Sequence, residues 1–526
     1  MKIVTAAQMR AIEAASERSG VSPDSLMERA GLAVAEGVRS MVGAAGVRIV
    51  VLVGPGNNGA DGLVAARHLR RWGAEVTCFI LGGRPEEDPK LNLAIEYGVG
   101  LIYEASPDMM DRMIARSALV IDAILGTGQT RPLEGIIKQT MEVLSNTRSI
   151  PKPPILLALD LPTGLNSDTG ALDSSSVPYD VTFALGYPKT GLLNFPGAAY
   201  AGKLEVLDIG VPVGLSEESE IMLETVDLGW VAEHLPVRPM DSHKGTFGHV
   251  LAVAGSKNYV GAAYLASQAC VRVGAGLTTL ATPQGIYPTV AAKSIEAIHL
   301  PLEESSEGMV AAGAAKALRD CTRRYTNILV GCGLGVSDGT MAFVEDLLFN
   351  RESSDFSDLT NLSALVDADG LNNLAKIDRW WERERGPMVL TPHPGEMSTL
   401  TGLTTVDIQQ DRVGVAREYA VRWGVCLVLK GANTIISQPN GVVRLAPLAN
   451  PGLSTGGTGD VLSGVISGLM AQGLPPIEAA TCGVYLHGEA GRDVVDNHGD
   501  TGLAASDLLS QIPDTFQRLR KWKVNY

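Results

Sequence analysis

RIVVLVGPGNNGADGL, from Arg48 to Leu63, is the segment that says most about the fold. Its apolar start predicts a buried strand, and the glycine-rich loop that follows predicts a tight turn into a helix. Gly54, Gly56 and Gly59 form the pattern G-x-G-x-x-G, which lets a backbone approach a pyrophosphate at a helix N-terminus. A buried strand, a loop and a helix in this order indicate an α/β fold.

The same alternation continues on both sides of this segment. Upstream, Ser22 is a candidate helix N-cap with Pro23 at the first helical position, and apolar residues then recur at helical spacing. Downstream, helical patterns separate the apolar runs, and Gly73 ends one of these helices. The strands expected in this half are 48–53, 75–81, 99–103, 118–124, 155–161, 180–185 and 203–209. Continuous apolar strands joined by helices predict a parallel, doubly wound sheet.

A second alternating region follows a break in the pattern. Residues 211–240 carry prolines and acidic residues without periodicity, which is typical of a linker. Beyond them, strands are expected at 248–254, 326–331, 362–366, 388–391 and 425–429. The sequence therefore predicts two doubly wound α/β domains, residues 1–215 and 241–526, with a linker at 216–240.

Composition limits the classes of partner. The chain has 526 residues and a formal net charge of −15, which repels nucleic acid and anionic membrane surfaces. The N-terminal segment lacks the apolar core of a signal peptide, and no apolar run approaches the length of a membrane span. Six scattered cysteines without a C-x-x-C pair are typical of reduced thiols. These features predict a cytoplasmic protein that binds neither nucleic acid nor membrane.

The glycine-rich loop at 54–59 departs from the usual NAD-binding pattern. That pattern needs an acidic residue about 20 positions on, at the end of the second strand, to hold the ribose hydroxyls. Gly82, Gly83 and Arg84 stand at that place here. Pro55 also removes a loop N–H that could face a phosphate. We therefore expect this loop to differ in function from an ordinary NAD cofactor site.

Polar side chains gather at three strand ends of the first domain. They are Asn57, Asn58 and Asp61 after the first strand, Asp122 in IDAILGTG, and Asp160 and Thr163 in LDLPTG. Carboxyl ends of parallel strands share one edge of the sheet, where open α/β sheets bind ligands. Each side chain alone could instead cap the turn that follows its strand. Oxygens with modest total charge, as in Asn58, Asp122 and Thr163, suit a weakly charged metal ion better than zinc.

GPGNNGADG, DAILGTG and LDLPTG resemble motifs of the NAD(P)H-hydrate (NAD(P)HX) epimerases. The resemblance implies a Rossmann-like three-layer sandwich whose loop binds the hydrated nicotinamide cofactor as substrate. It implies a potassium ion held by Asn58, Asp122 and Thr163. It also implies that Asp160 binds the substrate and acts as the catalytic acid/base. The other residues implied to bind the hydrate are Asn57, Asn58, Gly59, Ala60, Asp61, Gly126, Thr127, Gly128, Gln129, Thr130, Arg131 and Pro132.

The second domain carries a glycine-rich loop of another kind. NPGLSTGGTGDVLSG, residues 450–464, frees the backbone at Gly456, Gly457 and Gly459 and then enters an apolar helix. The N-terminus of that helix can hold an anion with its unpaired N–H groups. Asp460 stands at the same N-terminus, where a carboxylate is repelled by a phosphate, so a catalytic base explains it better than a helix cap does. No G-K-[ST] follows the glycines, so this is not a P-loop.

This loop, with HKGTFGHVLAVAGS, GCGLG, TPHPGEM and LKGANT, resembles the ADP/ATP-dependent NAD(P)HX dehydratases of the ribokinase-like superfamily. The resemblance implies a ribokinase-like domain that uses Mg²⁺ and ADP, with ATP as the alternative. It implies that the hydrate is bound by Ala262, Gly335, His393 and Asp460, of which Asp460 is catalytic. A lone His393 between prolines could instead pack at a turn. The residues implied to bind the nucleotide are Lys430, Gly431, Ala432, Asn433, Thr434 and Gly459.

The two resemblances imply one joint function. The hydrates NADHX and NADPHX form as two C6 epimers, and a dehydratase of this kind consumes only the S epimer, so an epimerase on the same chain would supply it. The dehydratase would phosphorylate the C6 hydroxyl at the expense of ADP, releasing AMP, and then eliminate phosphate. A homo-oligomer is implied as well. Two alternatives stay open: a ribokinase-like small-molecule kinase fused to a nucleotide-binding domain, and a first domain that binds ligand without catalysis.

Overall fold

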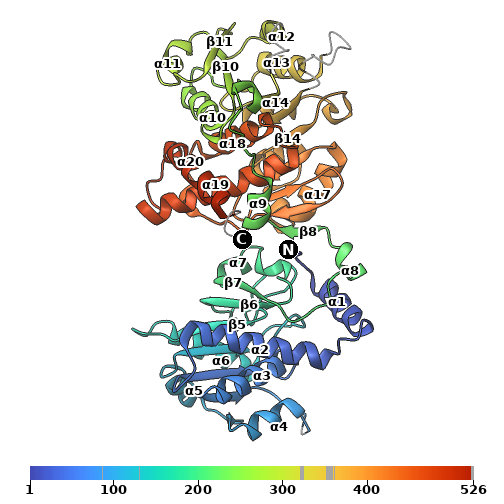
Figure 1. Cartoon of the computed structure of the whole chain (residues 1–526), viewed down its shortest axis with the longest axis vertical. Coiled ribbons are helices and arrows are strands. Elements are labelled where there is room, and N and C mark those ends of the chain that lie inside the picture. Colours follow the sequence, from blue (N-terminus) through green and yellow to red (C-terminus); the bar gives the residue numbers. More distant parts are fainter. Residues whose placement is uncertain (86, 130, 320–324, 351–358, 360–361, 523–526) are drawn as a thin grey trace. The chain divides into compact units, whose positions relative to one another are not determined.

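The computed structural model describes residues 1–526 except 86, 130, 320–324, 351–358, 360–361 and 523–526. The described chain divides into two compact units, Met1–Leu223 and Glu224–Tyr526. Each unit is built around one sheet with helices packed on its faces (Figure 1). The prediction of two α/β folds is confirmed.

The sheet of the first unit has seven parallel strands in the order β3-β2-β1-β4-β5-β6-β7. They are β1 (Arg48–Val53), β2 (Glu75–Ile80), β3 (Gly100–Ile102), β4 (Leu119–Ala123), β5 (Ile155–Leu159), β6 (Val181–Leu185) and β7 (Lys203–Leu207). Each falls within a predicted strand. The winding reverses between β1 and β4, so the carboxyl ends of these two strands flank the crevice where such sheets bind ligands.

Both faces of this sheet are covered. In β1, Ile49, Val51 and Val53 belong to one apolar cluster, while Val50 and Leu52 belong to the cluster on the other face. The covering helices are α1 (Ala6–Arg18), α2 (Pro23–Val42), α3 (Asn57–Arg71), α4 (Pro89–Glu96), α5 (Pro107–Ile114) and α6 (Gly135–Thr147), with the short turns η1 (Thr190–Leu192), α7 (Gly197–Tyr200) and α8 (Ser216–Ser219). Burial on two faces explains why central strands such as β1 and β5 carry apolar runs rather than an alternating pattern.

Helix caps fix the entry to the first two helices. The hydroxyl of Ser22 accepts the N–H of Ser25 with Pro23 in the first turn of α2, as predicted. Thr5 forms a capping box with Gln8 at the start of α1, which the sequence analysis did not identify. These caps place α1 and α2 beside the carboxyl edge of the sheet, where both helices contribute to the cavity described below.

The second sheet has ten strands in the order β11-β10-β9-β12-β13-β14-β15-β16-β17-β8. They are β8 (Leu223–Thr225), β9 (His249–Val253), β10 (Leu277–Pro283), β11 (Ile298–Leu302), β12 (Asn327–Val330), β13 (Ser363–Val366), β14 (Met388–Leu390), β15 (Cys426–Leu429), β16 (Ile435–Ser437) and β17 (Val443–Leu445). Neighbouring strands are parallel along β11-β10-β9-β12-β13-β14-β15. β16 pairs antiparallel with β15, and β17 pairs antiparallel with β16. The five predicted strands are present, but β8, β10, β11, β16 and β17 were not predicted.

The segment expected to be a linker, 216–240, contains regular structure. It holds α8, β8 and α9 (Leu228–His234). Next to β8, the Val226 N–H donates to the Leu445 carbonyl at 2.9 Å. The remaining helices are η2 (Lys244–Phe247), α10 (Val260–Val273), α11 (Tyr287–Ala291), η3 (Ala312–Ala314), α12 (Ala315–Arg319), α13 (Asp338–Phe349), α14 (Asp369–Leu374), η6 (Trp380–Glu382), α15 (Pro394–Thr401), α16 (Thr405–Gln410), α17 (Arg412–Trp423), η7 (Pro451–Leu453), α18 (Thr458–Ala471), α19 (Pro476–His498) and α20 (Ala505–Trp522).

Helix α18 runs through the core of the second unit. Small residues on one side let it approach α10 closely: a Cβ at Gly464 would lie 2.3 Å from the Ala266 oxygen, and one at Gly468 would lie 2.3 Å from Val273 Cγ1. The helix is therefore held tightly against α10, which helps to fix the position of its first turn, where Asp460 lies.

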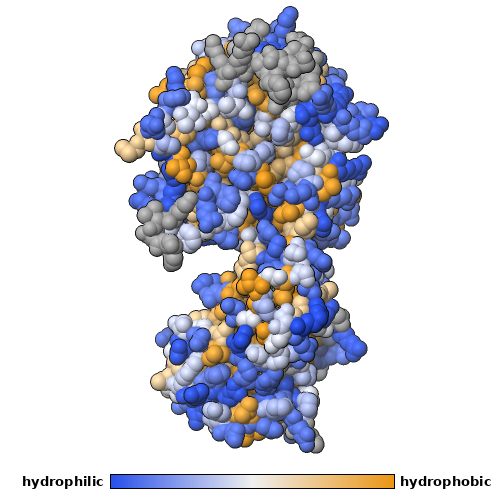
Figure 2. Space-filling view, turned by 45° about the vertical axis from the view of Figure 1, so that its right-hand side comes forward, coloured by the Kyte–Doolittle hydropathy of each residue, from blue (hydrophilic) through white to orange (hydrophobic). Residues whose placement is uncertain are grey.

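The hydrophilic surface and the free cysteines agree with the expectations drawn from the amino-acid composition. Hydrophilic side chains predominate on the visible face of each unit, with hydrophobic ones scattered among them (Figure 2). Within the described ranges, none of the helices has the length and apolarity that crossing a membrane would require. The described cysteines are free and buried, as expected of reduced thiols; they are Cys78, Cys270, Cys332, Cys426 and Cys482.

Candidate active sites

The first unit contains a cavity of about 1020 Å³ at the carboxyl edge of its sheet. Its walls are the loops after β1, β4, β5 and β6, together with α1 and α2. The predicted substrate-binding residues that line it are Asn57, Asn58, Asp61, Gly126, Thr127, Gly128, Gln129, Arg131, Pro132 and Asp160. Gly59 and Ala60 are instead buried in the first turn of α3, and Thr130 lies outside the described residues.

The three glycines at the turn between β1 and α3 have different surroundings. A Cβ at Gly54 would lie 1.8 Å from the Ile124 backbone oxygen, and one at Gly59 would lie 2.1 Å from the Gly54 oxygen. A Cβ at Gly56 would meet nothing within 4 Å, so this residue faces open space at the cavity. Arg84 donates to the carbonyls of Gly54 and Gly56 at 2.6 and 3.2 Å. The basic residue that replaces the expected acid therefore clamps the loop.

Asp122 is a buried carboxylate next to the cavity wall. Its Oδ1 accepts the Ile124 N–H at 3.0 Å and the Thr163 hydroxyl at 2.9 Å. Its Oδ2 accepts the Thr163 N–H at 3.0 Å and the Tyr179 hydroxyl. Burial raises the pKa of Asp122, although these four donors oppose the shift. In the part of the chain that the structure describes, no lysine, arginine or histidine forms an ion pair with Asp122.

The surroundings of Asp122 fit a monovalent cation. The Asn58 amide lies in the same cluster, since it donates to the Leu125 carbonyl at 3.2 Å, and the Leu125 N–H donates to the Thr163 hydroxyl at 3.3 Å. The structure thus brings Asn58, Asp122 and Thr163 together, as the sequence predicted. Their oxygens are hard donors with a single negative charge among them, and no cationic side chain of the described residues forms an ion pair with it.

Asp160 lies at the cavity wall in a strained backbone position, with φ of +67°. Its Oδ1 accepts the Leu185 N–H at 3.0 Å and forms an ion pair with Lys189, whose ammonium also donates to the Leu185 carbonyl at 3.0 Å. Burial, and then the carboxylates of Asp160 and Glu13, raise the pKa of Asp61 well above its usual range. Lys189 and Glu13 were not predicted from the sequence. The signal for Lys189 was a lysine just beyond an apolar strand, in GYPKTG.

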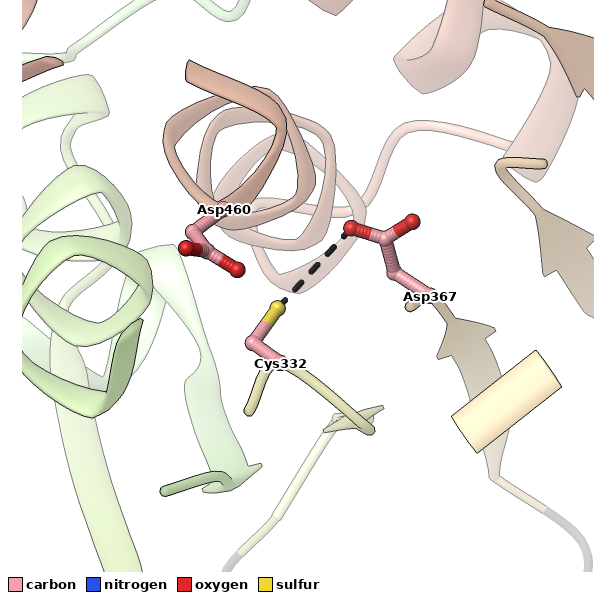
Figure 3. Close-up of side chains that lie close together, drawn as sticks. All are labelled: Cys332, Asp367 and Asp460. Atoms are coloured by element: carbon pink, nitrogen blue, oxygen red, sulfur yellow. Dashed lines mark hydrogen bonds between the residues drawn. The ribbon is translucent and has the colours of Figure 1, made fainter. Parts of the chain in front are cut away.

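The second unit assembles its own cluster at the carboxyl edge of its sheet (Figure 3). Asp460 comes from the first turn of α18, Cys332 from the loop after β12, and Asp367 from the end of β13. Their ligand atoms all lie within 4.8 Å of one another, and the Cys332 thiol donates to Asp367 Oδ2 at 3.9 Å. Burial, and then the negative charge of Asp367, raise the pKa of Asp460 to about 6. A carboxyl with such a pKa can accept a proton near neutral pH.

Asp367 was missed by the sequence analysis and proves central to this cluster. Its Oδ1 lies 2.7 Å from Lys430 Nζ, and its Oδ2 accepts the Ser463 hydroxyl at 2.7 Å. Lys430 Nζ also lies 3.5 Å from Glu396 Oε2. Burial lowers the pKa of Lys430, but the two carboxylates outweigh it and the net shift is upward. The signal for Asp367 was an aspartate directly after the apolar run at 363–366.

In the cluster of Cys332, Asp367 and Asp460, the two carboxylates are suitable Mg²⁺ ligands. Asp367 and Asp460 offer hard oxygens that face one another, which suits a divalent cation between the chain and phosphates. Cys332 does not fit it, because a thiol is a soft ligand. Burial, with the neighbouring carboxylates, also raises the pKa of Cys332 well above its usual range and keeps it protonated.

The predicted nucleotide-binding residues form the other side of the same edge. A Cβ at Gly459 would lie 3.6 Å from Lys430 Nζ, so these two residues are adjacent. Residues 431–434 form the loop between β15 and β16, and Asn433 has a positive φ of 54°. Arg412 donates to the carbonyls of Ala432 and Lys430 at 2.6 and 3.2 Å and holds this loop in place.

His393 caps a helix with one edge of its ring. Its Nδ1 accepts the N–H groups of Gly395 and Glu396 at 3.0 and 3.1 Å at the start of α15. The side chain is 55% exposed, and Nε2 on the opposite edge of the ring lies 3.4 Å from Glu396 Oε1. The turn-packing alternative thus describes the Nδ1 edge, while more than half of the side chain stays exposed.

Ala262 and Gly335 surround the loop that carries Cys332. A Cβ at Gly333 would lie 2.8 Å from the Ala262 side chain, and Gly335, with φ of +82°, donates its N–H to Asp369 at 2.9 Å.

A separate cavity of about 240 Å³ lies beside the start of the glycine-rich loop; it is lined by Leu448, Ala449, Asn450, Pro451, Gly488, Arg492, Val495 and Asp500.

Comparison with known proteins gives consistent results for the whole chain. Residues 250–514 match the family model described as NAD(P)H-hydrate dehydratase, and residues 23–191 match the YjeF-related protein N-terminus. The bifunctional NAD(P)H-hydrate repair enzyme of Moorella thermoacetica is 39% identical, over 99% of this chain and 98% of its own. The enzyme of the same description from Thermofilum pendens is 35% identical, over 99% of this chain and 97% of its own.

A solved structure resembles the second unit. It is the ADP/ATP-dependent NAD(P)H-hydrate dehydratase from Bacillus subtilis co-crystallized with ATP and Mg²⁺. It is 30% identical, covers 56% of this chain and 98% of its own, and has a TM-score of 0.49.

Proposed function

The chain belongs to the bifunctional NAD(P)H-hydrate repair enzymes, and we propose that its first unit interconverts the C6 epimers of NADHX and NADPHX while its second unit dehydrates the S epimer. The observation that carries this division is that each unit has its own cluster of acidic groups at the carboxyl edge of its own sheet. A kinase fused to a binding domain would need only the second cluster.

The cavity of the first unit is proposed as the epimerase site. Its volume of about 1020 Å³ stands at the upper end for small-molecule sites, as a dinucleotide substrate requires. Gly56 leaves the backbone open towards the ligand, and Asn57, Asp61 and Arg131 line the walls. Asp160 is the acid/base, because its carboxylate lies at the cavity wall and can take a proton from the substrate and return it.

Potassium is proposed for the cluster beneath this wall. Asn58, Asp122 and Thr163 would hold the ion, since their oxygens are clustered and the Asp122 charge has no ion-pair partner among the described residues. A bound cation would supply a fixed positive charge that orders the loop after β4 and favours an anionic substrate group. The residues themselves orient that loop, because Leu125 is tied to both Asn58 and Thr163.

In the second unit, Asp460 is proposed as the base that activates the C6 hydroxyl. The activated oxygen attacks the terminal phosphoryl group of ADP, and AMP leaves; with ATP as the alternative, ADP leaves. The phosphate on C6 is then eliminated, which restores the dihydronicotinamide. The N-terminus of α18, with Gly457 and Gly459 free of side chains, would receive the phosphates, and Lys430 lies beside it.

The rest of the second site is proposed to position the two ligands. Mg²⁺ would be held by Asp367 together with the nucleotide phosphates and would neutralise phosphate charge, which leaves Asp460 as the base. His393, Ala262 and Gly335 would contact the hydrate. Residues 430–434 would bind the nucleotide, and the cavity of about 240 Å³ beside the glycine-rich loop would accommodate its base.

The cellular setting is also part of the proposal. Buried, unpaired thiols support a reducing cytoplasm, and the net charge of −15 supports small-molecule partners over nucleic acid or membrane. The family resemblance supports a homo-oligomer.

The dehydratase assignment is tested with the purified S epimer. The enzyme is incubated with S-NADHX, Mg²⁺ and ADP or ATP, and the NADH and free phosphate that form are measured together. The proposal expects equal amounts of both products. A stable phosphorylated compound without NADH would support the kinase alternative instead.

A further inference from the structure

Lys189 is a buried cation that no predicted role explains. Its side chain is 1% exposed, yet it lines the cavity of the first unit. Two of its N–H bonds have partners, Oδ1 of Asp160 and the carbonyl of Leu185. Lysine is almost never buried without a charged partner, so its position must serve the carboxylate beside it.

The backbone around Lys189 is fixed by the N-terminal segment. The Val4 N–H donates to the Pro188 carbonyl and the Thr190 N–H donates to the Val4 carbonyl, both at 3.0 Å. Leu185 completes the frame, because its N–H donates to Asp160 Oδ1 while its carbonyl accepts from Lys189. Among the described residues, both hydrogen bonds to the Asp160 carboxylate, from Lys189 and from the Leu185 N–H, fall on Oδ1.

We propose that Lys189 is a positioning residue for epimerisation: by binding Oδ1 of Asp160, it leaves Oδ2 as the oxygen that exchanges a proton with the C6 hydroxyl of the hydrate. This inference rests on the proposed epimerase function. In the balanced step, the hydroxyl proton moves to Oδ2 and the O–H electron pair forms a C6=O double bond. The C6–N1 bond breaks, and its electron pair spreads from N1 into the conjugated carboxamide. Rotation of the aldehyde and the reverse steps give the other epimer.

Charge gives Lys189 a second effect on Asp160. The charged groups that face Asp160 are Lys189 from the loop after β6, Asp61 from α3 and Glu13 from α1. Asp61 and Glu13 add negative charge when ionised, which makes a further carboxylate unfavourable. The ammonium of Lys189 opposes them and favours the ionised form that can accept a proton.

The test compares four variants of the full chain by epimer exchange at several pH values. Lys189→Met removes the charge at similar length, Lys189→Arg keeps it, and Asp160→Asn removes the acid/base. Lys203→Met is the matched control, because Lys203 is 73% exposed in a surface ion pair with Glu205. The rates kcat and KM are separated by varying the concentration of one purified epimer.

Lys189→Met is expected to lower kcat at neutral pH by about tenfold or more with little change in KM. The pH midpoint of kcat should rise, because the variant removes the positive charge next to the carboxylate that accepts the proton. An unchanged midpoint would overturn the inference. If Lys189→Met is inactive at every pH, Lys189→Arg decides: retained kcat supports the positioning role, and equal inactivity overturns it. Wild-type exchange by Asp160→Asn would instead refute the acid/base role itself.

Discussion

Lys430 Nζ lies 2.7 Å from Oδ1 of Asp367, which joins the carboxyl ends of β13 and β15 across the intervening strand β14. Asp367 is 1% exposed and Lys430 is 16% exposed, so this ion pair is largely shielded from solvent. It lies next to Asp460 and accounts for part of that residue's raised pKa. The relationship links the fold of the second unit to its chemistry, because the same carboxylate anchors Lys430 and tunes Asp460.

Replacing Asp367 should therefore destabilise the second unit. Asp367→Asn leaves Lys430 buried with only the more distant Glu396, and loss of one partner of a buried pair costs about 3–5 kcal/mol. The free energy of unfolding can be followed in urea by tryptophan fluorescence, since five of the six tryptophans lie in this unit, at 230, 380, 381, 423 and 522. Ser463→Ala, which removes only a hydrogen bond to Asp367, should cost about 1 kcal/mol. Equal losses would contradict the assignment.

Dehydration should depend on the ionisation of Asp460. Its pKa is about 6, and only the ionised carboxylate can accept the C6 hydroxyl proton, so kcat should rise as pH increases through about 6. Initial rates with pure S-NADHX and saturating ADP measure this. Asp460→Asn should reduce kcat by at least about 10²-fold and abolish the pH step, while epimer exchange continues. A persistent step in the variant would assign the titration to another group.

The loop glycines of the first unit offer a matched pair. Gly54→Ala places a methyl group 1.8 Å from a backbone oxygen, so the turn between β1 and α3 must shift and epimer exchange should be largely lost. Gly56→Ala meets no atom within 4 Å of its Cβ and should leave the fold intact, as measured by the thermal unfolding transition. The reverse order of stability would show that the loop is not packed as described.

Potassium dependence should follow the integrity of the Asp122 cluster. Wild-type epimer exchange should fall when K⁺ is replaced by tetramethylammonium, because a large cation cannot enter a buried oxygen cluster. Asp122→Asn keeps the shape but removes the charge, so its residual rate should respond weakly to K⁺. Epimer ratios measured over time by chromatography report both rates. Equal K⁺ stimulation of the variant and the wild type would rule out Asp122 as a ligand.

Two variants separate the helix-capping role of His393 from its proposed contact with the hydrate. Asn is a good N-cap, so His393→Asn should preserve α15 but lose the exposed ring edge, raising KM for the hydrate with an unchanged unfolding transition. His393→Ala should in addition lower the free energy of unfolding by about 1 kcal/mol. If His393→Asn has the wild-type KM, the residue is a helix cap and does not contact the hydrate.

Much of the fold was predictable because buried parallel strands carry a strong sequence signal. The seven strands of the first sheet are mostly apolar segments between helical patterns, and β1 and β5 carry unbroken apolar runs. In the second sheet, β16 and β17 have only three residues each, and threonines at 278, 279 and 282 interrupt the apolar run of β10. β8 lies in a segment without periodicity and is a strand only because it pairs with a distant part of the chain.

The site was predictable where short motifs carry it and not where tertiary structure does. Asp122, Asp160 and Asp460 stood out because glycines and other polar residues surround them. Asp367 and Lys189 each follow an apolar strand, in VDADG and GYPKTG, and a charged residue at such a position is most often solvated. Only the packed structure shows that both are buried and that each is paired with a carboxylate or ammonium at an active edge.

The central claim is that one chain repairs both epimers, and a single reaction tests it. Wild type and Asp160→Asn are mixed separately with both NADHX epimers, ADP or ATP, Mg²⁺ and K⁺, and the dihydronicotinamide absorbance is followed to its end. The account predicts that the wild type recovers all of the hydrate as NADH. The variant should stop when the S epimer is consumed, apart from slow spontaneous exchange. A wild-type reaction that also stops at the S epimer, or that yields no NADH with either nucleotide, would contradict the account.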